Sequence, residues 1–122
     1  MSSPQTQILP LRNHELFESM YAPQGRPEFV YPILINFTAK WCGPCQRIDW
    51  DFLREEFPTL TIYKCDMDEN KYTPGFCGVK SIPSFMMIYG PKQVSQTVQI
   101  SDTAKIATWI FENMSKTKQK IQ

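Results

Sequence analysis

A pair of cysteines separated by two residues follows directly on an apolar segment of the chain. The apolar segment covers residues 33–37, and the pair lies in the sequence Trp41-Cys42-Gly43-Pro44-Cys45. A nearly continuous apolar run of this length predicts a central strand that is covered on both faces. Residues 45–57 follow a helical pattern that ends at Pro58, because a proline disfavours helix in the residue before it. The pair is therefore expected at a strand-to-helix junction.

The rest of the chain predicts alternating strands and helices around this junction. Strands are expected at residues 8–11, 60–65, 84–89 and 94–100, with a turn at Gly90-Pro91-Lys92. Helices are expected at residues 14–21, capped by Asn13, within residues 66–76, and from a cap at Ser101 or Asp102 to Met114. Residues 22–32 are rich in Pro and Gly and predict a loop. The pattern indicates an α/β fold with a mixed sheet of four to five strands and helices on both faces.

Length and charge exclude several classes of protein. The 122 residues suit one domain, residues 1–122, with a core at about 7–115 and a short, solvated, flexible tail at 116–120, an interaction tail being the alternative. Thirteen basic and twelve acidic residues give a net charge of +1, which offers no attraction for nucleic acid or an anionic membrane. No apolar run approaches a membrane span. The first seven residues lack the features of a secretory signal, so we expect a cytoplasmic protein.

The spacing of the two cysteines suits thiol–disulfide exchange. At the first turn of a helix, the sulfur of Cys42 would face unpaired backbone N–H groups, which favour thiolate over thiol. Cys45 would lie one turn inward and be more buried. Cys42 would then attack a substrate disulfide, and Cys45 would resolve the mixed disulfide. Gly43 would let a substrate backbone approach, and Pro44 is well tolerated in a first helical turn.

Roles without redox chemistry stay open for this cysteine pair. A structural zinc site would need two more ligands, but Cys65 and Cys77 are not paired at short spacing and His14 is distant. A metal or cluster bridging two copies of the chain, or a chance pair without a role, are further alternatives. Redox chemistry is favoured over all of them.

Several motifs together resemble the thioredoxin family. The segment from Ala39 to Cys45 after an apolar strand is similar to the active site of that family, and residues 78–85, Gly-Val-Lys-Ser-Ile-Pro-Ser-Phe, resemble its cis-proline segment. Residues 66–70 and the spacing between the motifs also match, and the resemblance covers about residues 7–115. It implies the thioredoxin fold and a protein-disulfide reductase whose redox centre is the Cys42–Cys45 disulfide, without metal or other cofactor. Its partners would be disulfide-containing proteins and a thioredoxin-reductase-like electron donor, and we expect a monomer.

The resemblance also implies roles for residues near the cysteines. Pro83 would be cis and pack against the active pair, and the backbone of Ile82 would bind an extended substrate strand. Trp41 would shield the sulfurs and contact substrate. The alternatives are an ordinary trans proline and a core aromatic side chain.

The sequence departs from the family pattern near the inner cysteine. Asn36 replaces a buried Asp, so the family's buried lysine, here Lys64, would lack a charged mate. We hypothesise that Lys64, or a water held by Asn36, takes the proton of Cys45. The missing anion would favour the thiolates and make the protein more oxidising. A neutral substitution without kinetic effect is the alternative.

Further departures concern the active-site helix and the docking surface. Trp50 replaces a kinking proline, so the helix is expected to run straighter, with Trp50 packing rather than contacting substrate. Gln99 or a neighbour replaces a glycine near the docking groove. Cys77 lies where some animal members carry an extra cysteine, so regulatory oxidation is weighed against an inert thiol, and Cys65 is expected to be buried packing.

Two other functions stay open from the sequence. The neutral Asn36 mildly favours a disulfide oxidase or isomerase. The replaced Asp, proline and glycine would also suit a partner-binding module whose redox activity is vestigial.

Overall fold

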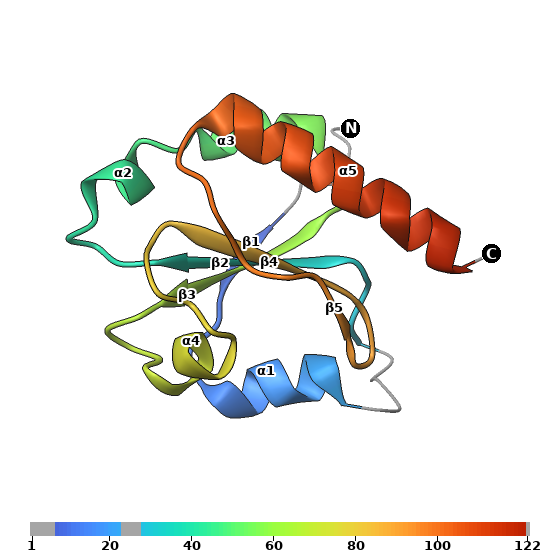
Figure 1. Cartoon of the computed structure of the whole chain (residues 1–122), viewed down its shortest axis with the longest axis horizontal. Helices are drawn as coiled ribbons and strands as arrows, with labels where there is room; N and C mark the ends of the chain where they lie inside the picture. The colour runs from blue at the N-terminus through green and yellow to red at the C-terminus, as the bar shows by residue number, and fades with distance from the viewer. Residues whose placement is uncertain (1–6, 23–27, 122) are drawn as a thin grey trace.

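Six strands within the described residues form one mixed sheet that has helices on both faces (Figure 1). The computed structural model describes residues 7–22 and 28–121, and the side chains as far as Ser115. The strands are β1 (Ile8–Pro10), β2 (Ile33–Thr38), β3 (Thr61–Asp66), β4 (Ser84–Gly90), β5 (Gln93–Val94) and β6 (Val98–Gln99). The helices are α1 (His14–Tyr21), α2 (Gly43–Gln46), α3 (Trp50–Glu56), α4 (Tyr72–Phe76) and α5 (Thr103–Ile121).

Strand β2 lies inside the sheet, as its apolar sequence predicts. The order is β1-β3-β2-β4-β5, and β6 also pairs with β4. Strands β1, β3 and β2 are parallel, whereas β4 is antiparallel to β2. Five of the six β2 residues are buried. The carboxyl end of β2 therefore emerges from the interior of the sheet, and the cysteine motif follows there.

The alternation of side chains along the strands builds two separate cores. On one face Ile33, Ile35 and Phe37 pack with Phe17 and Met20 of α1. On the other face Leu34 of β2 packs with Leu53 of α3 and with Ile106 and Ile110 of α5. Burial of apolar surface on both faces stabilises the layers by about 25 cal/mol per Å². Asn36 alternates with Ile35 and Phe37 and therefore faces the α3 and α5 side.

Capping residues determine where two of the helices begin. The side chain of Asn13 accepts a hydrogen bond from the Leu16 amide at 2.9 Å, and α1 has the predicted bounds. Asp102, one of the two expected caps, accepts from the Lys105 amide at 3.0 Å. Helix α5 continues to Ile121 instead of ending at Met114, because no Pro or Gly interrupts that stretch. The side chains of the expected tail at 116–120 lie outside the described residues, as do residues 23–27 of the expected loop.

The expectation of a single helix at residues 45–57 is wrong. Two helices, α2 and α3, take its place and are separated by residues 47–49. The absence of a proline does not keep the helix continuous, because Asp49 begins a new one. Its side chain accepts from the Phe52 amide at 3.0 Å, and its own amide donates to Thr103 Oγ1 at 3.0 Å. An N-cap of this kind stabilises a helix start by about 1 kcal/mol.

The predicted hairpin is present, but its second strand is divided. The expected strand at 94–100 forms β5 and β6, which both pair antiparallel with β4. Between them the hydroxyl of Ser95 accepts a hydrogen bond from the Met87 amide, and the Ser95 amide donates to the Met87 carbonyl. The described part of the sheet thus has six strands rather than four to five. None of the described helices is long and apolar enough to cross a membrane.

Candidate active site

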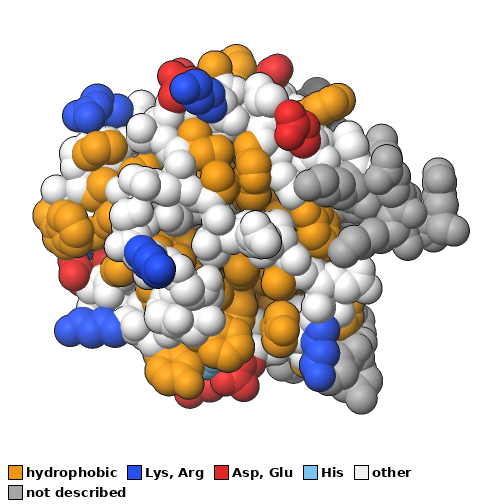
Figure 2. Space-filling view, viewed as in Figure 1, with side chains coloured by type: hydrophobic (Ala, Val, Ile, Leu, Met, Phe, Trp, Pro, Cys, Tyr) orange, Lys and Arg blue, Asp and Glu red, His pale blue; other side chains and the backbone are white. Residues whose placement is uncertain are grey.

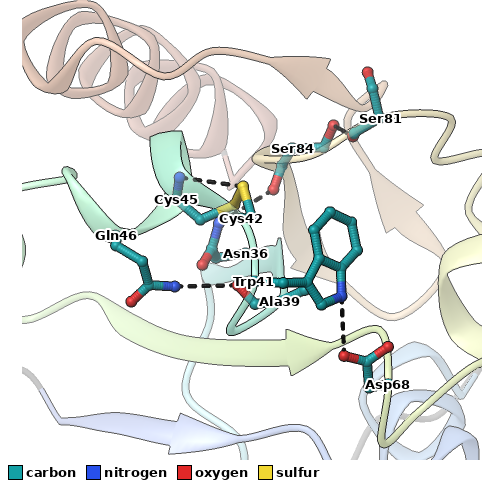
Figure 3. Close-up of a disulfide and its surroundings, with 9 residues drawn as sticks. All are labelled: Asn36, Ala39, Trp41, Cys42, Cys45, Gln46, Asp68, Ser81 and Ser84. Carbon is teal, nitrogen blue, oxygen red and sulfur yellow. Dashed lines mark hydrogen bonds between the residues drawn. A yellow bond between two sulfur atoms is a disulfide. The ribbon is translucent and has the colours of Figure 1, made fainter.

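The two motif cysteines form a disulfide immediately after β2 (Figure 3). Their Cα atoms are 5.3 Å apart. Both side chains are buried, each with 5% of its surface exposed. The expectation that Cys45 is the more buried of the two is therefore wrong for this oxidised state, because the disulfide holds both sulfurs in one cluster with Ala39.

Hydrogen bonding distinguishes the two sulfurs where burial does not. Cys42 is the N-cap of α2, and its Sγ accepts a hydrogen bond from the Cys45 amide at 3.2 Å. Gly43 and Pro44 follow in the first turn and are exposed. Helix α2 has only four residues, so its dipole is small. The local N–H group is the main feature that favours a thiolate on Cys42.

The loop before the disulfide is held by Gln46, a residue that the sequence did not point to. Gln46 donates from Nε2 to the Ala39 carbonyl at 3.0 Å, and the Cys42 amide donates to the same carbonyl at 3.2 Å. Ala39 packs directly against both cysteines. The position of Gln46 directly after Cys45 was the only signal in the sequence, since glutamine at that place has no chemistry of its own.

The cis-proline segment lies against the disulfide as the resemblance implied. The Ile82–Pro83 peptide bond is cis, and Pro83 is buried. The half-buried side chain of Ile82 packs against the cluster of Ala39 and the two cysteines. The hydroxyl of Ser84 donates to the Ser81 carbonyl at 2.5 Å and closes the turn around Pro83. The alternative of a trans proline is wrong.

Trp41 lies on the surface and is not a core side chain. It is 69% exposed, and its Nε1 donates to Asp68 Oδ2 at 3.1 Å (Figure 3). In Figure 2 an apolar patch covers the end of the molecule where the loop after β2 turns toward α2 in Figure 1. The exposed Trp41 and the half-buried Ile82 leave apolar surface beside the disulfide. Asp68 belongs to a segment that matches the family pattern, but its contact with Trp41 was not predicted.

Asn36 is a buried polar residue beneath the redox pair. Only 1% of its surface is exposed, and its Nδ2 donates to the Ser84 carbonyl at 3.4 Å. In Figure 3 its side chain extends from β2 toward the disulfide. The amide is thus tied to the cis-proline segment and is placed to hold a polar group near Cys45.

Lys64 is the register partner of Asn36 on β3. Burial lowers the pKa of the Lys64 ammonium from its usual value, as the sequence indicated. No ion pair joins Lys64 to another described residue. Its Nζ lies 4.6 Å from the ring centroid of Trp50, a cation–π geometry. Trp50 is half-buried and packs on Phe85 and Lys64, which confirms packing as its role.

The other two cysteines lie away from the redox pair. Cys65 is fully buried and packs in the core beneath α1, as expected, and Cys77 is half-buried against the same core. Burial raises the pKa of both thiols to about 12. A thiol of that pKa carries almost no thiolate at neutral pH, which favours the inert alternative for Cys77. Gln99 is exposed on β6 and pairs with Ser84, next to Pro83.

Metal coordination finds little support in this arrangement. Within the described ranges, no three His, Cys, Asp or Glu side chains come together as metal ligands. His14, considered as a zinc ligand, instead bonds through Nδ1 to Thr73 Oγ1 at 2.9 Å and lies 3.2 Å from Glu18.

Comparison with known proteins agrees with this geometry. The family model described as thioredoxin matches residues 28–112. The chain belongs to the thioredoxin family. A thioredoxin of Geodia cydonium is 37% identical over 83 residues, 66% of this chain and 78% of that protein. A thioredoxin of Haemophilus influenzae is 36% identical over 86 residues, 68% of this chain and 80% of that protein.

Solved structures show the same fold at lower identity. The crystal structure of a thioredoxin from Trypanosoma brucei brucei superposes with a TM-score of 0.75 at 22% identity, covering 94% of this chain and 97% of that one. Oxidised mitochondrial thioredoxin 3 of Saccharomyces cerevisiae gives a TM-score of 0.68 at 24% identity, covering 86% and 94%.

Family and site together define the reaction class. The chain is a thiol–disulfide oxidoreductase of the protein-disulfide reductase type, which works by dithiol–disulfide exchange through Cys42 and Cys45. Thioredoxins act on disulfide-containing proteins and are reduced by thioredoxin reductase. Their redox-active group is the disulfide itself and not a separate cofactor.

Proposed function

We propose that Cys42 is the attacking nucleophile and Cys45 the resolving thiol in the reduction of protein disulfides. One observation carries this assignment: Cys42 Sγ accepts the backbone N–H of Cys45 at the start of α2. A donor aimed at sulfur stabilises the thiolate. The thiolate is the reactive form in exchange.

The exchange proceeds in two balanced steps. The Cys42 thiolate attacks one sulfur of the substrate disulfide; a Cys42–substrate disulfide forms, and the other substrate sulfur leaves as a thiolate that takes up a proton. Cys45 then loses its proton and attacks Cys42 Sγ, which releases the second substrate thiol. The substrate gains two electrons and two protons, and the chain is left with the Cys42–Cys45 disulfide seen here. A separate reductase returns the two electrons.

The proton of Cys45 must leave through a buried site. Asn36 can hold a water by its amide but cannot accept a proton. Lys64 has a lowered pKa and occupies the same row of the sheet. We therefore assign the proton to Lys64 or to a water held by Asn36.

The apolar surface around the disulfide is the docking surface in this proposal. The exposed indole of Trp41 and the half-buried Ile82 flank the buried sulfurs, with cis-Pro83 beside them. A substrate strand would bind along the Ile82 backbone by main-chain hydrogen bonds. Exposed Gln99, opposite Ser84, would shape the far side of this surface and adjust partner choice.

The protein is further proposed to act as a monomeric single domain, residues 1–122, in the cytoplasm, transferring electrons from a thioredoxin-reductase-like donor. Two cysteines outside the redox pair, the buried Cys65 and the half-buried Cys77, are free thiols, which suits a reducing compartment. The net charge of +1 gives no field for nucleic acid or anionic membranes as partners. Cell fractionation would test the location, and sedimentation the monomer.

Trapping with a Cys45→Ser variant tests the roles of both cysteines. Without the resolving thiol, the mixed disulfide on Cys42 should accumulate and be visible as partner bands that reductant releases. A Cys45→Ser, Cys42→Ser double variant is the matched control and should trap nothing. Trapping through Cys45 in a Cys42→Ser variant, with none in Cys45→Ser, would reverse the assignment.

A further inference from the structure

A row of three side chains in register crosses the sheet beneath the redox pair. Asn36 of β2 is in register with Phe85 of β4 on one side and with Lys64 of β3 on the other. The three side chains lie on the sheet face that α3 and α5 cover, where Phe85 belongs to the buried core. Asn36 is therefore the middle member of a row that ends in an aromatic ring and an ammonium.

Trp50 spans this row. Its ring centroid lies 4.6 Å from Lys64 Nζ and 6.3 Å from the ring of Phe85. These two contacts are with the outer members of the row, so the indole extends from one end of the row to the other. Trp50 begins α3, whose start is determined by the Asp49 cap. The cap that divides the active-site helix thus also places the indole.

The charged groups around Lys64 do not replace this contact. Lys40, Asp66 and Glu69 line the same pocket of about 330 Å³ as Lys64, yet none forms an ion pair with it among the described residues. On α3, Asp49 is engaged as the cap and Asp51 lies 3.7 Å from Arg54. The ring face of Trp50 is consequently the main group that stabilises the charged form of Lys64. It offsets part of the free-energy cost of burying the ammonium.

The ammonium is also close to the redox pair through the pocket wall. Ala39 and Gln46 line the pocket together with Lys64. Ala39 packs against Cys42 and Cys45, and Gln46 follows Cys45 directly. Ala39 and Gln46 thus connect the pocket that holds the Lys64 ammonium to Cys45, whose thiolate forms during resolution.

We propose that Trp50 is a positioning residue for the redox reaction, holding the Lys64 ammonium in place beneath the inner cysteine. The proposal rests on the redox function proposed above. Trp50 takes no part in bond making; it acts through Lys64, whose ammonium, formed when the lysine takes the proton of Cys45, stabilises the Cys45 thiolate. In this chain the indole face of Trp50 stabilises the charged form of Lys64, as a neighbouring carboxylate would otherwise do.

Trp109 provides a matched control. Its indole packs on the same Phe85 ring at 6.4 Å, as Trp50 does at 6.3 Å. Both indoles are half-buried in the same core, but of these two only Trp50 contacts a cation among the described residues. Removal of either ring therefore has a similar packing cost, whereas only Trp50 is expected to affect thiolate formation.

The test is a pH titration of thiolate absorbance in the reduced protein between about pH 6 and 11, below the range in which the buried thiols ionise. Trp50→Leu should raise the upper apparent pKa of the cysteine pair by about 0.5 units. Lys64→Met should raise it at least as far, and Trp50→Leu should add nothing in a Lys64→Met background. Trp109→Leu should leave the profile unchanged. An unshifted Trp50→Leu profile, an equal shift without Lys64, or an equal shift in Trp109→Leu would overturn the proposal.

A second measurement covers the case in which Trp50→Leu does not fold. Trp50→Phe keeps a ring with a weaker cation–π face, so an NMR titration of the Lys64 side chain should show a lower pKa than in the wild type. An unchanged Lys64 titration would overturn the proposal. This readout needs no redox activity, so its failure is separate from a failure of the proposed function, which absent disulfide reduction by the wild type would reveal.

Discussion

The chain contains two pairs of cysteines, and Cys42 of one pair differs from Cys65 of the other in hydrogen bonding more than in burial. Cys42 and Cys45 are each 5% exposed, and Cys65 is fully buried. Cys42 Sγ accepts an N–H from the Cys45 backbone. Cys65 Sγ instead faces the Asn70 carbonyl as a donor at 3.8 Å. A donor aimed at sulfur favours thiolate, whereas an acceptor favours thiol.

This difference teaches that burial alone does not make a cysteine inert. Burial raises the pKa of Cys65 and Cys77 to about 12, and proximity to Cys77 adds to the effect on Cys65. In the redox pair the start of α2 supplies an amide donor to Cys42 Sγ, which favours its thiolate. Apolar surface lies at both places, over the loop after β2 and over α4 (Figure 2). Position relative to a backbone donor therefore distinguishes Cys42 from Cys65.

Removal of one sulfur from each pair should give the largest difference, in the rate of protein-disulfide reduction. Cys42→Ser should lower the rate of protein-disulfide reduction by at least about 10³-fold, because the nucleophile is lost. Cys77→Ala should stay within about twofold of the wild type, since its thiol is protonated. The measurement is insulin-disulfide reduction with dithiothreitol. Equal activity of Cys42→Ser and wild type would favour the binding-module alternative.

Alkylation of the reduced protein compares the pairs directly. At pH 7, iodoacetamide should modify Cys42 on the order of 100-fold faster than Cys65 or Cys77, because only the thiolate reacts. Peptide mass spectrometry against time measures each site. Unfolded protein in denaturant is the control, and there the rates should converge. Early modification of Cys77 in the folded protein would support a regulatory thiol instead.

Cys65 and Cys77 should make the free energy of unfolding depend on pH in the alkaline range. The folded pKa values of Cys65 and Cys77 are raised from about 9 to about 12, so their protonated forms stabilise the fold. That contribution is complete below about pH 9 and is lost as pH rises toward 12. Urea unfolding of the oxidised protein should show the fall beginning near pH 9.

A Cys65→Ala, Cys77→Ala variant should be less stable at pH 7 but lose less stability between pH 9 and 10. The raised pKa values of Tyr31, Tyr63 and Tyr89 act in both proteins and cancel in the comparison. Parallel curves for the two proteins would show that the thiols ionise normally in the fold.

The smallest expected effect concerns Asn36, the buried residue beneath the redox pair. Asn36→Asp should lower the reduction potential by about 10–30 mV, since a buried anion destabilises the thiolates and hence the reduced form. A glutathione redox titration measures this shift, with Asn70→Asp as the control, because Asn70 is also buried but bonds to Leu11 and Thr73. A raised or unchanged potential would contradict the hypothesis that Asn36 makes the protein more oxidising.

Much of the fold could be predicted because its signals are local. The bounds of α1 follow from Asn13 and the spacing of Leu16, Phe17 and Met20. The division of the active-site helix could not be predicted, although Asp49 is a good cap residue. Whether an Asp caps or lies on an exposed helix face depends on a distant partner, here Thr103 Oγ1 on its amide.

The sequence by itself determined the reaction. Two cysteines spaced by two residues at the end of an apolar strand favour sulfur chemistry through local geometry, and the family resemblance implies a proline segment that meets them. Only the tertiary structure decided the surroundings: the equal burial of Cys42 and Cys45, the bond from Trp41 to Asp68, and the indole over Lys64. The last two contacts join residues on different elements of the chain, and such long separations carry no periodic signal. Sheet register prepares the contact of Trp50 with Lys64, because it places Asn36, Lys64 and Phe85 in one row that Trp50 contacts at both ends.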